Sequence, residues 1–187
     1  MFDFAAKFER ALSYEKFLAA HGSDEHCRRW ATMHASIQLS EPQLAALKDF
    51  RREMKVLCVA GTWCGDCVNQ CPIFDHFAHA APAIQLRFMD RDADPDLAGE
   101  LKICGGGRVP VVVFLSEDGQ LVGWYGDRTI SKYRQMAVDQ LGSSCPTGIV
   151  PPGAALTAAV VQDWLDEFER VQLLLRISPR LRQLHGD

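Results

Sequence analysis

Three cysteines fall within eight residues of the chain, in the stretch GTWCGDCVNQCP at 61–72. They are Cys64, Cys67 and Cys71. Cysteines at such short spacing occur in metal sites, in structural disulfides and in thiols that exchange disulfides. The compartment of the protein and the elements that carry the cysteines must decide between these uses.

Length, composition and the N-terminal sequence limit the class of protein. The chain has 187 residues, of which 48% are hydrophobic, seven cysteines, an odd number, and a net charge of −4. This length fits one domain with appendages, and a basic patch for nucleic acid or an anionic membrane is missing from the sequence. The first 17 residues do not resemble a secretory signal and no apolar run is long enough for a membrane span. We therefore expect a cytoplasmic protein with reduced thiols and with neither nucleic acid nor membrane as a partner.

The cysteine cluster lies between a predicted strand and a predicted helix. KVLCVA at 55–60 is a short apolar run typical of a buried strand, and residues 65–80 continue as a helix. The other predicted elements are helices at 3–20, from Ser23, at 41–53, 94–101 and 129–141, strands at 84–89, 109–115 and 120–126, and a last helix beyond a proline-rich connector at 143–153. EDG at 117–119 joins the last two strands as a hairpin. This order predicts an α/β fold with a mixed central sheet flanked by helices.

The position of Cys64 indicates a reactive thiol. It stands at the first turn of the predicted helix, where free backbone N–H groups and the helix dipole stabilise a thiolate and lower its pKa from about 8.5 to about 7. Cys67 lies one turn further on, placed to attack a mixed disulfide on Cys64. We interpret Cys64 as nucleophile and Cys67 as resolving thiol, joined in the oxidised state by a redox-active disulfide. Trp63 supplies an apolar wall beside Cys64, and Gly65 lets another backbone approach.

Two motifs in the correct order resemble the thioredoxin family. The first is Trp63-Cys64-Gly65-Asp66-Cys67 after a buried strand, in the AG-x-WCGDC form of bacterial thioredoxin-like proteins, and the second is Val109-Pro110 at the start of a later strand. The resemblance covers about residues 40–141. It implies a thioredoxin-like fold, with an N-terminal helical extension at 1–39 and, at 142–187, a connector and a C-terminal helix that packs on the domain.

The resemblance also implies an activity. A thiol–disulfide oxidoreductase of this family reduces or exchanges disulfides of proteins or small molecules, supports cell redox homeostasis, binds no cofactor and receives electrons from a separate reductase. The resemblance further implies a cis Val109-Pro110 bond that faces the cysteine pair and pairs with an extended substrate segment. Trp63, Gly65, Val109 and Pro110 are thus the expected substrate-binding residues.

Two residues depart from the thioredoxin pattern and are expected to modulate the pair. Asp66 stands where thioredoxins usually have proline, and its charge opposes a thiolate on Cys64 by roughly a pKa unit or less. Cys58 stands where thioredoxins keep a buried aspartate that moves the proton of the resolving thiol. A neutral thiol is a poor substitute, so slower turnover is expected, although Cys58 is also a suitable small residue for a core strand.

Two other classes of function stay open from sequence. Cys67 and Cys71, in the pattern C-x-x-x-C-P, resemble the ligands of thioredoxin-fold copper-delivery proteins, but the distal histidine of those proteins is missing and no metal site is predicted. Cys71 is expected to pack in the core. The alternative is an interaction protein whose redox chemistry is incidental. Its surface would be an apolar stripe on the last helix, which packs on the domain or forms a dimer, so that both monomer and homodimer remain open; the stripe comprises Val161, Trp164, Leu165, Phe168, Val171 and Leu175.

Overall fold

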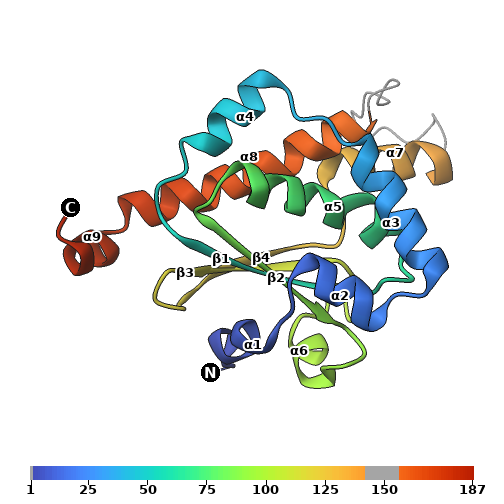
Figure 1. Cartoon of the computed structure of the whole chain (residues 1–187), viewed down its shortest axis with the longest axis horizontal. Coiled ribbons are helices and arrows are strands. Elements are labelled where there is room, and N and C mark those ends of the chain that lie inside the picture. The colour runs from blue at the N-terminus through green and yellow to red at the C-terminus, as the bar shows by residue number, and fades with distance from the viewer. Residues whose placement is uncertain (1, 142–155) are drawn as a thin grey trace.

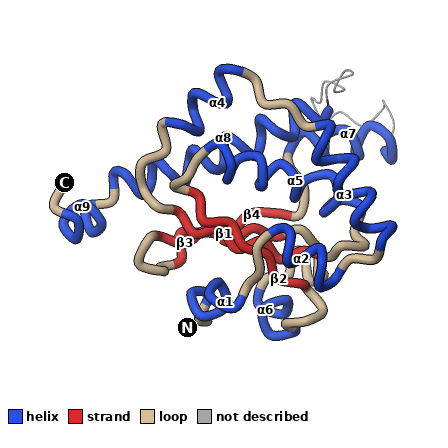
Figure 2. The backbone as a smooth tube through the Cα atoms, in the orientation of Figure 1, coloured by secondary structure: helices blue, strands red, loops and turns tan. Residues whose placement is uncertain are grey.

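The structure is a computed structural model that describes residues 2–141 and 156–187, so the connector expected at 143–153 lies outside the described residues. Figures 1 and 2 show a central layer of strands with helices on both sides. The helices are α1 (Phe4–Arg10), α2 (Tyr14–His21), α3 (Asp24–Ser36), α4 (Glu41–Lys48), α5 (Gly65–Ala80), α6 (Pro95–Glu100), α7 (Ile130–Leu141), α8 (Leu156–Ile177) and α9 (Pro179–His185). The strands are β1 (Met54–Ala60), β2 (Ile84–Asp90), β3 (Val111–Ser116) and β4 (Leu121–Gly126).

The described strands form one mixed sheet in the order β2-β1-β3-β4. β1 pairs with β2 in parallel, whereas β3 pairs antiparallel with both β1 and β4. Every residue of β3 is buried, as expected for a central strand covered on both faces, and β4 at the edge is half-exposed. The predicted α/β class with a mixed sheet between helices is confirmed.

The face of the sheet that carries α5 is closed by the long helix α8. The ring centre of Phe168 on α8 lies 5.3 Å from that of Phe77 on α5 and 5.2 Å from that of Phe114 on β3, and both pairs are edge-to-face. Trp164, one turn earlier, is fully buried and donates its indole N–H to Gln70 Oε1 at 2.8 Å. The apolar stripe of this helix therefore packs inside the molecule and holds α5 against the sheet.

The N-terminal segment is two helices, not the single helix expected at 3–20. The chain leaves helical geometry at Ala11, and Ser13 caps α2 by accepting a hydrogen bond from the amide of Lys16. Between the helices, Leu12 exchanges two backbone hydrogen bonds with Phe88 of β2, at 2.9 and 2.7 Å. The periodic apolar residues that suggested one helix face the same core, but the pairing with β2 interrupts the helix.

The helix expected over 41–53 ends at Lys48, and residues 49–53 form the approach to β1 instead. Buried Gln172 of α8 holds this approach. Its Oε1 accepts hydrogen bonds from the amides of Arg51 (3.0 Å) and Arg52 (2.7 Å), and its Nε2 donates to Arg52 O at 2.9 Å. Backbone groups paired with α8 in this way do not continue a helix.

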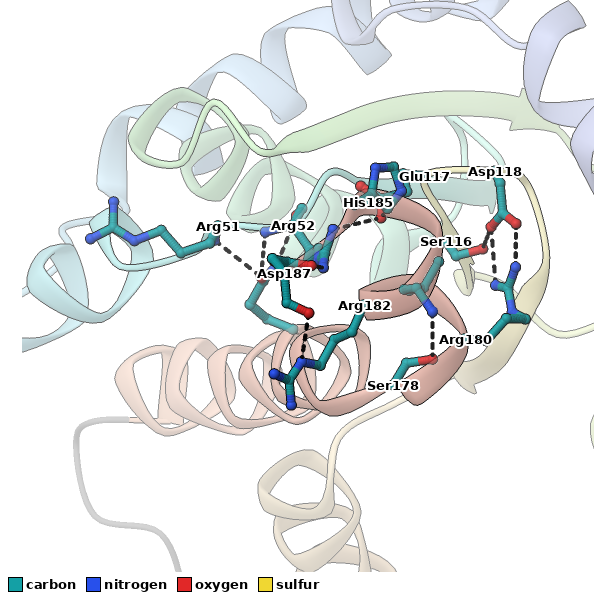
Figure 3. Close-up of polar contacts among 12 residues, drawn as sticks. Arg51, Arg52, Ser116, Glu117, Asp118, Ser178, Arg180, Arg182, His185 and Asp187 are labelled. Atoms are coloured by element: carbon teal, nitrogen blue, oxygen red, sulfur yellow. Dashed lines mark hydrogen bonds and ion pairs between the residues drawn. The ribbon is translucent and has the colours of Figure 1, made fainter.

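The short helix α9 was not predicted, because charged contacts rather than an apolar period hold it in place. Figure 3 shows these contacts around the turn between β3 and β4. Arg52 pairs with Glu117 at 3.2 Å and with Asp187. His185 lies 2.7 Å from Glu117, and Arg180 pairs with Asp118.

Within 2–141 and 156–187, no helix combines the length and apolar character that a bilayer crossing requires.

Candidate active site

Cys64 lies where β1 has ended and α5 begins. It is the N-cap residue of α5, and its sulfur faces the amides of Asp66 and Cys67 in the first turn. The sulfur is partly exposed and lies 3.6 Å from the carbonyl oxygen of Val109, 45 positions along the chain. The Val109–Pro110 peptide bond is cis, and β3 starts directly after it. The fold thus brings the two sequence motifs together at one edge of the sheet.

Cys67 lies under Cys64 and has no solvent exposure. The amide of Gly61 donates to its sulfur at 3.5 Å. Burial raises the pKa of Cys67, but hydrogen bonds from the neighbouring thiols of Cys64 and Cys71 outweigh burial and lower it to about 5. The pKa of Cys64 is raised, because its proton is shared with Cys67 and because the thiol is partly buried.

The two sulfurs therefore differ in exposure and ionise as a coupled pair. The sequence predicts a lowered pKa from the helix dipole at Cys64 alone, whereas in the structure the Gly61 amide and the Cys71 thiol also act on the pair through Cys67. No spacing rule reveals these contacts. Cys64 is the accessible sulfur of the pair, and Cys67 is the buried one.

Asp66 has a partner that the sequence did not identify. Arg128, directly after β4, pairs with the Asp66 carboxylate at 2.5 Å and with Asp127 at 2.9 Å. Burial raises the pKa of Asp127, but a hydrogen bond from Tyr133 and the nearby Arg108 lower it below its usual range. Arg128 balances much of the negative charge that Asp66 places beside the cysteines. In the sequence, the feature that could have indicated this network is the adjacent pair Asp127-Arg128 directly after a predicted strand.

Trp63 and Gly65 frame the exposed side of Cys64. The Trp63 side chain is 44% exposed, and the guanidinium of Arg91 lies 4.7 Å from its ring centre. A side chain on Gly61 would lie 2.8 Å from the same ring, so glycine is required there for close packing. A side chain on Gly65 would meet nothing within 4 Å. The surface over Gly65 is therefore open beside the Cys64 sulfur.

The N-terminal helices hold the loop that precedes Cys64. The indole N–H of fully buried Trp30, on α3, donates to Thr62 O at 2.9 Å. The hydroxyl of Thr62 donates to His21 O, at the end of α2, also at 2.9 Å. Sequence reasoning missed Trp30 and Thr62, because contacts between α2, α3 and the active loop join distant parts of the chain.

Cys58 lies on β1, fully buried, with its sulfur 3.7 Å from that of equally buried Cys71. Burial raises the pKa of both thiols. Each cysteine that the structure describes is a free thiol. Among the described residues, no group of three histidines, cysteines or acids is arranged to hold a metal ion.

Comparison with known proteins places this geometry in a family. A thioredoxin family model matches residues 11–140. A protein of unknown function from Pseudomonas aeruginosa, PA1234, is similar in structure with a TM-score of 0.67 and 21% identity over 91% of this chain and 97% of its own. An HIV epitope-scaffold is similar with a TM-score of 0.60 and 20% identity over 100% and 99% of the two chains. These two likenesses concern the fold alone. The search of curated proteins found no match. Because the family model spans more than half of the sequence, the chain belongs to the thioredoxin family.

Proposed function

We propose that the protein is a thiol–disulfide oxidoreductase in which Cys64 attacks and Cys67 resolves. The observation that carries the proposal is the position of the Cys64 sulfur. It is partly exposed at the N-terminus of α5, beside the Val109 carbonyl, and it shares a proton with a buried second thiol. A family whose members exchange disulfides and a pair of adjacent cysteines both fit a redox role.

The reaction begins with a proton transfer inside the pair. The Cys64 proton passes to the Cys67 sulfur, and the Cys64 thiolate then attacks one sulfur of a substrate disulfide. The other substrate sulfur leaves as a thiolate, and a mixed disulfide remains on Cys64. Cys67, once deprotonated, attacks the Cys64 sulfur, forms the Cys64–Cys67 disulfide and releases the reduced substrate.

The substrate segment is proposed to lie over Gly65, between Trp63 and the Val109-Pro110 turn. Open space above Gly65 and the partial exposure of Trp63 support this path. The backbone of Val109, which lies beside the Cys64 sulfur, is proposed to pair with an extended segment. Substrates of this kind are disulfide-containing proteins or small molecules.

The physiological setting belongs to the same proposal. The Trp-Cys-Gly-Asp-Cys motif favours the bacterial thioredoxin-like branch. A reducing compartment such as the cytoplasm would keep the thiols ready, with a separate reductase as electron donor. The match to a thioredoxin family model supports a redox role without identifying the donor.

A trapping experiment tests the assignment of the two thiols. Cys67→Ser is expected to accumulate a mixed disulfide with a small disulfide substrate at Cys64, because the resolving sulfur is missing. Cys64→Ser is expected to form no adduct and to lose at least about a hundredfold in dithiothreitol-driven disulfide reduction. Mass spectrometry of the intact protein and the reduction rate measure the two effects.

Cys104→Ser is the matched control, because Cys104 is an exposed cysteine that is not part of the Cys64–Cys67 pair. It is expected to keep the wild-type rate. A Cys64→Ser variant that reduces disulfides as fast as wild type would remove the basis of the proposal.

A further inference from the structure

The two buried cysteines behind the active site form a pair of their own. Cys58 is on the central strand β1 and Cys71 is on α5, 13 positions later, and their sulfurs are 3.7 Å apart. Neither side chain has any solvent exposure. Residues 56, 58 and 60 share one face of β1, since side chains alternate along a strand, and this face looks toward α5. The pairing is thus a feature of how α5 packs on β1.

This inner pair is connected to the outer pair through Cys67. Cys71 lies one helical turn beyond Cys67 on α5, both side chains are fully buried, and each thiol influences the pKa of the other. The sulfurs of Cys64, Cys67, Cys71 and Cys58 consequently follow one another from the surface into the core. Of these four, Cys64 alone reaches solvent. An external oxidant meets the inner pair only by way of the outer one.

We propose that Cys58 and Cys71 are a second, internal dithiol that takes over the disulfide formed between Cys64 and Cys67. The proposal rests on the proposed function, because substrate reduction supplies the first disulfide. It extends that function, since one fully reduced chain could then donate four electrons instead of two and would end with two disulfides instead of one.

The transfer is two thiol–disulfide exchanges. Cys71, as a thiolate, attacks the Cys67 sulfur, so that the Cys67–Cys71 bond forms and Cys64 leaves as a thiolate. Cys58, as a thiolate, then attacks the Cys71 sulfur, so that the Cys58–Cys71 bond forms and Cys67 leaves. The protons lost by Cys58 and Cys71 are taken up by Cys64 and Cys67. One disulfide exists before and after, so no further oxidant or reductant takes part.

Burial determines the speed of this exchange. A buried thiol ionises reluctantly, so the attacking thiolates of Cys71 and Cys58 are rare. The internal step should therefore be slower than capture of a substrate disulfide by Cys64. A first turnover would oxidise Cys64 and Cys67. The slower, unimolecular transfer of the disulfide to Cys58 and Cys71 would follow, and a second turnover would come after it.

The experiment follows thiols and disulfides after oxidation of the full-length protein. Reduced protein is mixed with excess hydroxyethyl disulfide, quenched with acid at intervals, alkylated and digested without reduction. Cleavage after Trp63 separates Cys58 from the other three cysteines of the series. A Cys64–Cys67 disulfide then stays within one peptide, whereas a Cys58–Cys71 disulfide joins two peptides.

The expected wild-type result is loss of two thiols per chain in a fast phase and two more in a slower phase. The rate of the slower phase should not depend on protein concentration, and the joined peptides should appear with it. The Cys71→Ala variant should lose only two thiols per chain. The control variant Cys27→Ala, which changes a cysteine outside the series, should still lose four. Cys64→Ser should form no Cys58–Cys71 disulfide in the same time.

The other results overturn the proposal in distinguishable ways. Complete formation of the Cys64–Cys67 disulfide with no peptide joined through Cys58 would overturn the internal transfer and leave the proposed function standing. A Cys58–Cys71 disulfide that forms equally fast in Cys64→Ser would show direct oxidation and also overturn the transfer. Failure of any disulfide to form in wild type would overturn both. Wild-type protein alone gives the first and third results, so the test does not depend on a variant that folds.

Discussion

In the proposed reaction Cys64 and Cys67 have different tasks, because the same helix start exposes one sulfur and buries the other. The buried sulfur accepts a hydrogen bond from the Gly61 amide, and the exposed thiol donates one to the Val109 carbonyl at 3.6 Å. Access would therefore select Cys64 for attack, while its coupling to Cys67 would set the pH at which the pair loses its first proton.

Cys67→Ala tests this coupling. A lowered pKa means that the thiolate exists above that pKa and is lost as the pH falls through it. In wild type, alkylation of Cys64 by iodoacetamide should gain rate through a pKa below the ordinary value of about 8.5. Without Cys67 the proton has no shared acceptor, so this pKa should rise by about one unit or more. Cleavage and mass spectrometry report alkylation at Cys64.

Cys104→Ala serves as the control for the titration, since this thiol is exposed and is not part of the pair. The pH dependence of Cys64 alkylation in this variant should match that of wild type. Identical profiles for Cys67→Ala and wild type would contradict the shared proton.

Arg128 compensates Asp66, and its removal should make the pair harder to ionise. In Arg128→Gln the Asp66 carboxylate loses its 2.5 Å partner. The pKa for Cys64 alkylation should then rise by roughly one unit or less, because an unbalanced negative charge disfavours a nearby thiolate. Adding Asp66→Asn should reverse the rise, and the four proteins form a double-mutant cycle.

Arg134→Gln is the matched control for this cycle, because Arg134 is an exposed arginine of α7. It should leave the pKa unchanged. A rise in Arg128→Gln that persists after Asp66→Asn would mean that Arg128 acts through Asp127 instead.

Local sequence identified the residues of the site that are neighbours along the chain and missed those that are not. Trp63 to Cys67 could be recognised because a strand, a short loop and a helix start are all local features. Arg128 and Trp30 meet the site through tertiary packing, so no spacing could reveal them. Thr62 is a neighbour of Trp63 in the chain, but its partners His21 and Trp30 are distant in sequence. The pairing of Cys58 with Cys71 was missed for the same reason, since it depends on the register between β1 and α5.

Among the elements, α8 packs large aromatic side chains against α5. Trp164→Ala removes a fully buried ring and its hydrogen bond to Gln70, so it should lower the free energy of unfolding by about 3–5 kcal/mol. Leu173, on the same helix, is 49% exposed, and Leu173→Ala should cost no more than about 0.5 kcal/mol. Urea unfolding followed by circular dichroism measures both. A Trp164→Ala loss below about 1 kcal/mol would mean that α8 adds little to the core.

Elements with a strong local signal were predicted nearly to the residue, and elements shaped by distant partners were not. The helix expected at 65–80 agrees with α5, and the N1 proline rule located α6. The break at Ala11 and the early end of α4 at Lys48 follow from pairing with β2 and α8, which the apolar period does not record. The charged contacts of α9 are equally invisible to periodicity.

In the whole molecule, the N-terminal helices complete the core. Phe17 of α2 and Trp30 of α3 are both fully buried, and Phe17 stacks on Phe88 of β2 at 5.4 Å. Residues 1–39 were predicted to be an addition to the domain at 40–141. Because their aromatic side chains are buried against β2, we expect the stability of the sheet to depend on them.

Deletion of residues 1–39 tests that dependence. The deletion uncovers Phe88 and frees the Thr62 loop, so we expect loss of the cooperative urea transition and binding of a hydrophobic dye. Deletion of residues 179–187 is the control, because α9 contributes a single buried residue, Leu181, to the core. That protein should still unfold in one transition. Cooperative unfolding without residues 1–39 would show that the sheet folds without them.

The two backbone hydrogen bonds between Leu12 and Phe88 also matter for solubility. An uncovered outer strand is a template onto which a second polypeptide can add and start aggregation. At the middle of β2 that position is already taken by the protein's own chain, and a competing strand would have to pull α1 and α2 apart to reach it. A single residue between two short helices thereby shields one border of the sheet from self-association.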